Sequence, residues 1–175
     1  MDMAILYGIQ SCLGCPFLDT VMPYVTMLGE HGAVWLVIGI GLMISKKYRM
    51  WGAVMLVAMA SAYLIGEELV KPLVARPRPF DIDTAYRLLI QAPSGYSMPS
   101  GHTSASFAAA TVLLFAPLKR RWKAGAFVLA ALIAFSRLYL FVHNPSDVLA
   151  GAVLGGICAL CAVGVMRAVS KHRNS

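Results

Sequence analysis

The sequence predicts an all-α integral membrane protein, a bundle of five transmembrane helices preceded by an N-terminal interfacial helix, six helices in all. Of its 175 residues, 59% are hydrophobic and only 13% are charged, and the mean hydropathy is +0.71. Soluble domains average about 45–50% apolar and 25% charged residues. The apolar residues also fall into runs that approach the roughly 20 residues needed to cross a bilayer as a helix. We therefore expect residues 1–175 to form a single membrane-embedded domain.

The predicted helices follow the apolar runs in order. The run from Met3 to Phe17 is interrupted by glycine, polar residues and Pro16, which favours an interfacial helix over a span. The first predicted span contains Glu30 and His31, and the longest polar segment, residues 71–98, follows the second. The five predicted spans are Val21 to Ser45, Trp51 to Gly66, Thr103 to Leu118, Ala124 to Val142 and Val148 to Met166.

The distribution of charge predicts the orientation in the membrane. Ten basic residues follow the first, third and fifth predicted spans: Lys46, Lys47, Arg49, Lys119, Arg120, Arg121, Lys123, Arg167, Lys171 and Arg173. Because Lys and Arg collect in cytoplasmic loops, we expect a cytoplasmic C-terminus in a plasma membrane. The net charge of +7 is then a topology signal, and no nucleic-acid partner is expected.

Five basic residues on the predicted outer side oppose this bias, and three of them point to function. Lys71 ends the second predicted span, Arg78 lies seven residues further on, and Arg137 lies near the end of the fourth predicted span. Charge at membrane depth is usually functional, so these side chains predict a cationic cup at the outer membrane surface. For Arg76 and Arg87, an anchoring role in which the side chain snorkels to the interface is the simpler interpretation.

Two predicted spans begin with sequences suited to anion chemistry at the same outer face. The third opens with Pro99-Ser100-Gly101-His102, where unpaired backbone amides at a helix start can bind phosphate. The fifth opens with His143-Asn144-Pro145-Ser146-Asp147, in which Asn144 can cap the helix and His143 and Asp147 are four residues apart. We expect residues 71–98 to form an extracytoplasmic loop that carries part of the same site.

This set of residues predicts phosphoryl transfer, which needs cations for the phosphoryl oxygens, a nucleophile and an acid for the leaving oxygen. An imidazole becomes a nucleophile when a carboxylate holds its other nitrogen, which suits His143 with Asp147 and leaves His102 as the acid. A metal site is the rival use of such residues. Neighbouring Lys and Arg would repel a divalent ion, so we expect no metal and no cofactor.

The same residues resemble a known family. Lys71 with six residues to Arg78-Pro79, then Pro99 to His102, then Ser136-Arg137 with five residues to His143 and three more to Asp147 are similar to the three-part signature of the type 2 phosphatidic acid phosphatase superfamily. The resemblance covers residues 71–147 and points to the small membrane-embedded bacterial members.

The resemblance implies a metal-independent lipid phosphatase or diphosphatase that passes through a phosphohistidine. His143 would attack phosphorus, Asp147 would orient it and His102 would protonate the leaving oxygen. The groups that would hold the phosphoryl oxygens are Lys71, Arg78, Ser100, Gly101 and Arg137.

Further polar residues leave two interpretations open. Glu30, His31, Glu67 and Glu68 are possible headgroup contacts. Alternatively, either of the last two pairs with Lys71 along the helix, and the first two bridge to another span. A disulfide between Cys12 and Cys15 is also open, whereas Cys158 and Cys161 are interpreted as packing residues.

The expected substrate is a membrane lipid with a terminal phosphate or diphosphate, and other membrane lipids are the expected surroundings. Among the substrates of the family that the sequence resembles, undecaprenyl diphosphate, recycled for cell wall biogenesis, is the first choice. The alternative is phosphatidic acid or phosphatidylglycerol phosphate. An alternative of another class is a noncatalytic lipid transporter or scramblase, which needs cations but neither a nucleophile nor a proton donor.

Overall fold

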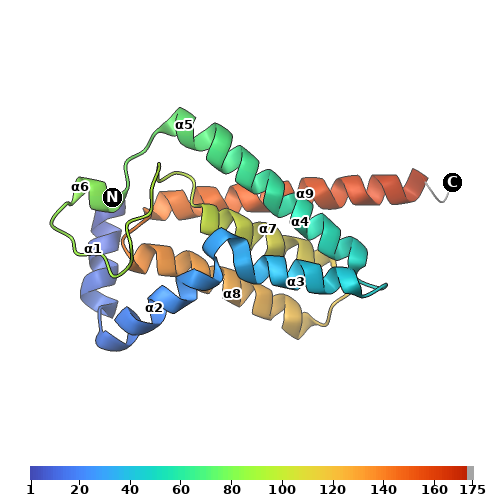
Figure 1. The fold of residues 1–175 in the computed structure, drawn as a ribbon, viewed down its shortest axis with the longest axis horizontal. Helices are drawn as coiled ribbons and strands as arrows, with labels where there is room; N and C mark the ends of the chain where they lie inside the picture. Colours follow the sequence, from blue (N-terminus) through green and yellow to red (C-terminus); the bar gives the residue numbers. More distant parts are fainter. Residues whose placement is uncertain (173–175) are drawn as a thin grey trace.

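The computed structural model describes residues 1–172, and this part of the chain is mainly helical and contains no β-strand (Figure 1). The α-helices are α1 (Asp2–Leu13), α2 (Pro16–Leu28), α3 (Ala33–Ile44), α4 (Arg49–Tyr63), α5 (Lys71–Val74), α6 (Pro79–Ile82), α7 (Gly101–Phe115), α8 (Arg120–Tyr139) and α9 (Pro145–His172). The predicted all-α class is therefore confirmed.

Several of these helices are long and apolar enough to cross a membrane. Among residues 1–172, the stretch Arg49–Ile82, α8 and α9 meet this criterion, α2 and α3 meet it together as a bent pair, and α7 is a shorter apolar helix. An integral membrane bundle is thus supported, while the count of five spans stays a prediction.

The predicted span from Val21 to Ser45, whose apolar run is interrupted by Glu30 and His31, is bent at these two residues. The chain bends by 46° between α2 and α3, through a single 3₁₀ turn, Glu30–Gly32. Within this turn His31 has φ 48° and Gly32 has φ 70°, and residues in the left-handed region cannot continue a right-handed helix. The break turns Glu30 toward the start of α7, where its Oε2 lies 3.5 Å from Nε2 of His102.

The second predicted span, by contrast, continues beyond Gly66. After α4 the helix widens into a π-helical segment, Leu64–Val70, and then runs on as α5 to Val74. Such wide turns are frequent at functional sites. Here the segment brings Glu67 and Lys71 to the same side of the helix, with Lys71 Nζ 2.7 Å from Glu67 Oε1.

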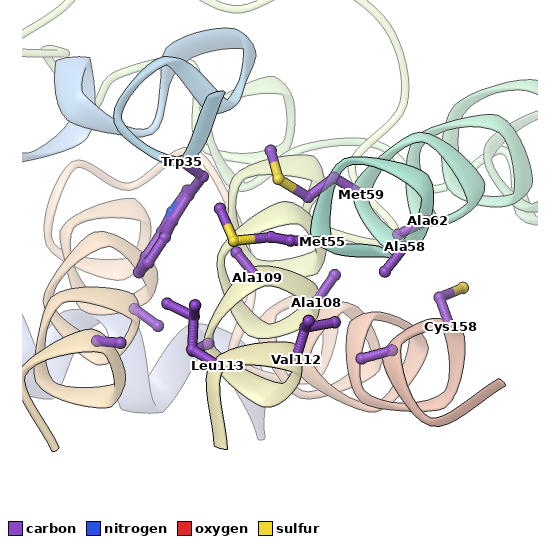
Figure 2. Close-up of a cluster of buried hydrophobic side chains, with 14 of the residues drawn as sticks. Trp35, Met55, Ala58, Met59, Ala62, Ala108, Ala109, Val112, Leu113 and Cys158 are labelled. Carbon is purple, nitrogen blue, oxygen red and sulfur yellow. The ribbon is translucent and has the colours of Figure 1, made fainter. Parts of the chain in front are cut away.

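Helix α7 lies at the centre of the bundle and contacts α4, α8 and α9. Small residues make this possible: Ala108, Ala109 and Ala110 of α7 are all fully buried. Figure 2 shows Met55 and Met59 of α4 and Trp35 of α3 in one buried cluster with side chains of α7. The indole of Trp35 also donates a hydrogen bond of 2.9 Å to Ser106.

The two ends of the bundle differ in their chemistry. Helix α1 crosses the end where α7 and α9 begin, while the α3–α4 and α7–α8 connections and the C-terminal part of α9 lie at the other end (Figure 1). Nine of the ten basic residues used to predict the orientation belong to that far end; Arg173 lies outside the described residues. All four cysteines are free thiols, with Cys158 buried and Cys161 exposed.

Candidate active site

A cavity of about 940 Å³ opens among the loop that follows α6 and helices α3, α4, α7 and α8. Most of the residues singled out in the sequence contribute to its wall. Those that line it are Glu30, His31, Glu67, Lys71, Arg78, Gly101, His102, Arg137 and His143. Segments separated by more than 100 residues in the chain thus converge on one space.

His143 lies in the turn between α8 and α9, and Asp147 lies in the first turn of α9. The Nδ1 atom of His143 is 3.7 Å from Asp147 Oδ2. The backbone amide of Asn144 donates to the same Oδ2 at 2.7 Å and so caps the helix start. On the other side of the ring, Nε2 is 3.3 Å from Arg78 Nη1, so the nitrogen that faces the cations is the one free to react.

Burial keeps the His143 imidazole neutral. This side chain is 2% exposed, and burial, aided by the guanidiniums of Arg137 and Arg78, lowers its pKa to about 3 against the opposing effect of Asp147. A buried ring next to cations disfavours the charged form. The neutral form is the one that carries a lone pair on nitrogen and acts as a nucleophile.

The three cations are almost fully buried, and each is held by a different partner. Lys71 pairs with Glu67, and Arg137 Nη1 donates to the Thr26 hydroxyl at 2.6 Å. Arg78 donates to the backbone carbonyls of Ser94, Gly95 and Val142, and its Nη1 atom also contacts His143 Nε2. Because the charge of Arg78 has no carboxylate hydrogen-bonded to it among residues 1–172, it remains available to an anion in the cavity.

His102 occupies the second position of α7, and its Nε2 atom is buried without a hydrogen-bond partner among the described residues. The Nε atom of Arg137 is in the same state. Buried polar groups normally have partners, and both residues line the cavity. These two nitrogens are therefore donors that a phosphate group in the cavity would satisfy.

The remaining predicted residues differ in whether they line the cavity. Gly101 lines the cavity, but the Ser100 hydroxyl is fully buried and accepts hydrogen bonds from the backbone amide and the hydroxyl of Thr103. Ser100 thus caps α7, and its side chain is not part of the cavity wall. Glu68 is exposed outside the cavity, whereas His31 borders it with a largely exposed side chain.

Sequence reasoning missed Ser97 and misjudged Arg76. The Ser97 hydroxyl, fully buried, donates to Asp147 Oδ2 at 2.5 Å and lies 3.4 Å from His143 Nδ1. Its position, two residues before Pro99, was the one available signal. The interpretation of Arg76 as a membrane anchor is wrong, because its guanidinium donates to the buried carboxylate of Asp147 at 2.6 Å. Arg87 is exposed.

We expect Ser97→Ala to lower kcat roughly tenfold, because removing one partner of a buried carboxylate costs about 1–3 kcal/mol. The loss should fall on kcat more than on KM, since Ser97 contacts Asp147 and His143 rather than the cavity. Steady-state phosphate release from purified protein measures it. Ser11→Ala, at an exposed serine of α1, is the matched control and should leave both constants unchanged; equal losses in the two variants would contradict the prediction.

Comparisons with known proteins identify similar chains. Residues 51–171 match the PAP2 superfamily. An undecaprenyl-diphosphatase of Sulfolobus acidocaldarius is 32% identical over 148 residues, which are 85% of this chain and 70% of the relative. The crystal structure of Aquifex aeolicus LpxE superposes with a TM-score of 0.81 at 30% identity, covering 93% of this chain and 94% of the other. A PAP2-type phosphatidylglycerolphosphate phosphatase from Bacillus subtilis gives 0.77 at 27% identity, covering 96% and 85%.

Proposed function

The chain belongs to the PAP2 superfamily and is a membrane-embedded lipid phosphatase, and we propose that it converts undecaprenyl diphosphate to undecaprenyl phosphate. Membership confirms the resemblance that the motifs carry. The relative from Sulfolobus acidocaldarius, named an undecaprenyl-diphosphatase, supports this choice of substrate. The identity of the lipid is the part of the proposal that experiment has to decide.

One observation carries the proposal for a lipid: a single cavity has a charged part and an apolar part. The histidines and cations described above line it, and so do apolar side chains of α3, α4 and the start of the π-helical segment. The apolar members are Leu36, Leu56, Met59, Ala60, Ala62 and Leu64. A pocket of this kind fits an amphiphile, because a phosphate headgroup needs the cations and a hydrocarbon tail needs an apolar wall.

In the first step of the proposed reaction, Nε2 of His143 attacks the terminal phosphorus and the bond to the bridging oxygen breaks. Asp147 stabilises the positive charge that develops on the imidazole. Lys71, Arg78 and Arg137 balance the charge on the nonbridging oxygens, with the Gly101 amide at the helix start as a further donor. Since these cations already neutralise the phosphoryl group, the step requires no metal.

His102 handles the proton in both steps. It donates a proton to the leaving oxygen in the first step and is then neutral. In the second step the neutral ring accepts a proton from the water that attacks the phosphohistidine, which releases inorganic phosphate and restores His143. Two carboxylates lie at the edge of the phosphate site. Glu30 Oε2 is 3.5 Å from His102 Nε2, and Glu67 pairs with Lys71.

The proposal includes an orientation. The site and the loop 71–98 lie at the end of the bundle opposite the basic connections (Figure 1). With those connections in the cytoplasm, the site faces the extracytoplasmic side and the C-terminus is cytoplasmic. In this arrangement residues 1–175 act as one catalytic domain.

We expect purified protein in detergent to release phosphate in the presence of EDTA, and to do so fastest from undecaprenyl diphosphate. The measurement compares that lipid with phosphatidic acid and phosphatidylglycerol phosphate at equal surface concentration. Loss of activity in EDTA would contradict the metal-independent mechanism.

The other outcomes separate the alternatives. Faster phosphate release from either glycerolipid would identify that lipid as the substrate in place of undecaprenyl diphosphate. The structural similarity to a phosphatidylglycerolphosphate phosphatase from Bacillus subtilis is the reason to test this alternative. Binding of all three lipids without phosphate release would favour a noncatalytic transporter or scramblase.

A further inference from the structure

Arg76 joins three segments that are far apart in the chain. Its Nη1 atom donates to Asp147 Oδ1 at 2.6 Å and to the Ser146 hydroxyl at 2.6 Å, and its Nη2 atom donates to Asp2 Oδ2 at 2.7 Å. The Ser146 hydroxyl in turn donates to the same oxygen of Asp2. The guanidinium therefore lies between a carboxylate of α1 and the carboxylate that contacts His143.

The buried Asp147 carboxylate depends on Arg76 to compensate its charge. The residue is fully buried, and a buried carboxylate is costly unless a cation and further donors compensate it. Ser97 and the Asn144 amide both bind Oδ2, whereas Arg76 binds Oδ1. Among residues 1–172, Arg76 is the one arginine or lysine that forms an ion pair with Asp147.

Backbone hydrogen bonds also fix the positions of the segments that carry Arg76 and Asp147. The Ser97 amide donates to the Arg76 carbonyl at 2.9 Å, and the Ser100 amide donates to the Asp147 carbonyl at 3.0 Å. Two donors to the Asp147 carboxylate, Ser97 and Arg76, are thus bonded to each other. Asp2 completes the set, because hydrogen bonds from Ser146 and Arg76 hold the pKa of Asp2 below its usual value and keep it charged.

We propose that Arg76 and Asp2 are positioning residues, which hold the Asp147 carboxylate in the orientation that fixes His143. The contacts form a chain of four residues, Asp2 to Arg76 to Asp147 to His143, with its outer end on the N-terminal helix. This inference rests on the proposed function in assigning His143 as the nucleophile. It adds that α1, outside the residues that resemble the family signature, sets the geometry of the site.

Two effects are expected if the chain acts as described. Loss of the Arg76 cation leaves the Asp147 carboxylate less neutralised, which stabilises the imidazolium and moves the pKa of His143 upward. Loss of the two donors also frees the carboxylate to rotate, which lowers kcat. The charged or titratable groups that face the His143 ring are Arg78, Arg137, Asp147 and His102, and none of them is substituted in the Arg76 and Asp2 variants below.

The experiment follows the ring of His143 directly. Histidine is labelled with nitrogen-15 in the full chain, and the ring nitrogens of the four histidines are titrated by NMR, with His143→Ala used to assign the signals of His143. We expect the pKa of His143 to be higher in Arg76→Gln than in the wild type, and to rise by a smaller amount in Arg76→Lys. An unchanged titration in Arg76→Gln overturns the inference, and this readout does not require that any lipid be hydrolysed.

Kinetics supply the second test, on whichever lipid the wild type hydrolyses. We expect Arg76→Gln to lower kcat roughly tenfold to a hundredfold, in the range seen when groups that orient a reactive ligand are removed. KM should change little, and Arg76→Lys should recover part of the loss. Arg87→Gln, an exposed arginine of the same loop, is the matched control and should retain wild-type kcat.

A double-mutant cycle tests the link to α1. Asp2→Asn should lower kcat in the wild-type background and have no further effect in Arg76→Gln, because its influence passes through the guanidinium. Independent, multiplicative losses would contradict the chain. If the wild type releases no phosphate from any of the three lipids while the titration still moves, the proposed function fails and the positioning contact stands.

Discussion

His143→Ala is expected to abolish phosphate release, lowering kcat by roughly 10⁴-fold or more, as removal of a catalytic nucleophile does in comparable enzymes. The imidazole is the group that would form the bond to phosphorus, and no neighbouring side chain can substitute for it. Asp147 is fully buried behind it and His102 is required as the acid. The measurement is single-turnover phosphate release with the protein in excess over lipid.

The control uses another histidine. His172 lies at the end of α9, at the opposite end of the bundle from the cavity (Figure 1). His172→Ala should retain full activity. A folded His143→Ala protein that still turns over at a rate comparable to the control would exclude the phosphohistidine mechanism.

Gly155→Ala is expected to destabilise the protein by roughly 1–3 kcal/mol, the usual cost of overpacking a tight core. A Cβ at this position would overlap the Ser104 carbonyl oxygen and would lie 2.8 Å from the Ala108 backbone nitrogen. Backbone atoms cannot move aside as a flexible side chain can, so α7 and α9 must separate. Because the starts of these two helices carry His102 and Asp147, phosphate release should fall as well.

The adjacent glycine provides the matched control. Among residues 1–172, a Cβ on Gly156 would meet no atom within 4 Å apart from its chain neighbours and the nearby backbone of α9, and alanine has the higher helix propensity by about 1 kcal/mol. We therefore expect Gly156→Ala to be neutral or slightly stabilising when thermal unfolding is followed in detergent. Equal destabilisation by both substitutions would mean that helix packing at Gly155 is not the cause.

The spacing of the motifs predicted much of the candidate site. His143 and Asp147 are four residues apart at a helix start, so local geometry alone brings them together. Lys71 and Glu67 have the same spacing, and the expected pairing along the helix is observed at 2.7 Å. Composition was equally informative for the fold class, because apolar runs of this length have few stable alternatives in a bilayer.

Contacts between distant segments could not be predicted in this way. The 46° break between α2 and α3 depends on left-handed conformations at His31 and Gly32, and it places Glu30 beside His102. The Arg137 guanidinium donates a hydrogen bond to Thr26, which is 111 residues away in the chain. Neither residue carries a periodic signal, and a hydrophobicity pattern contains no information about which polar groups meet across a bundle.

The sequence by itself therefore predicted a helical membrane protein, because hydropathy and charge bias act locally along the chain, and the resemblance of its motifs to a known family predicted a phosphatase and the residues of its candidate site. Only the tertiary structure decided that Ser100 caps a helix, that Ser97 binds Asp147, and that Arg76 is the counter-ion of that carboxylate. The physical reason is burial: a charge removed from water must find its partners wherever the packing of the helices brings them.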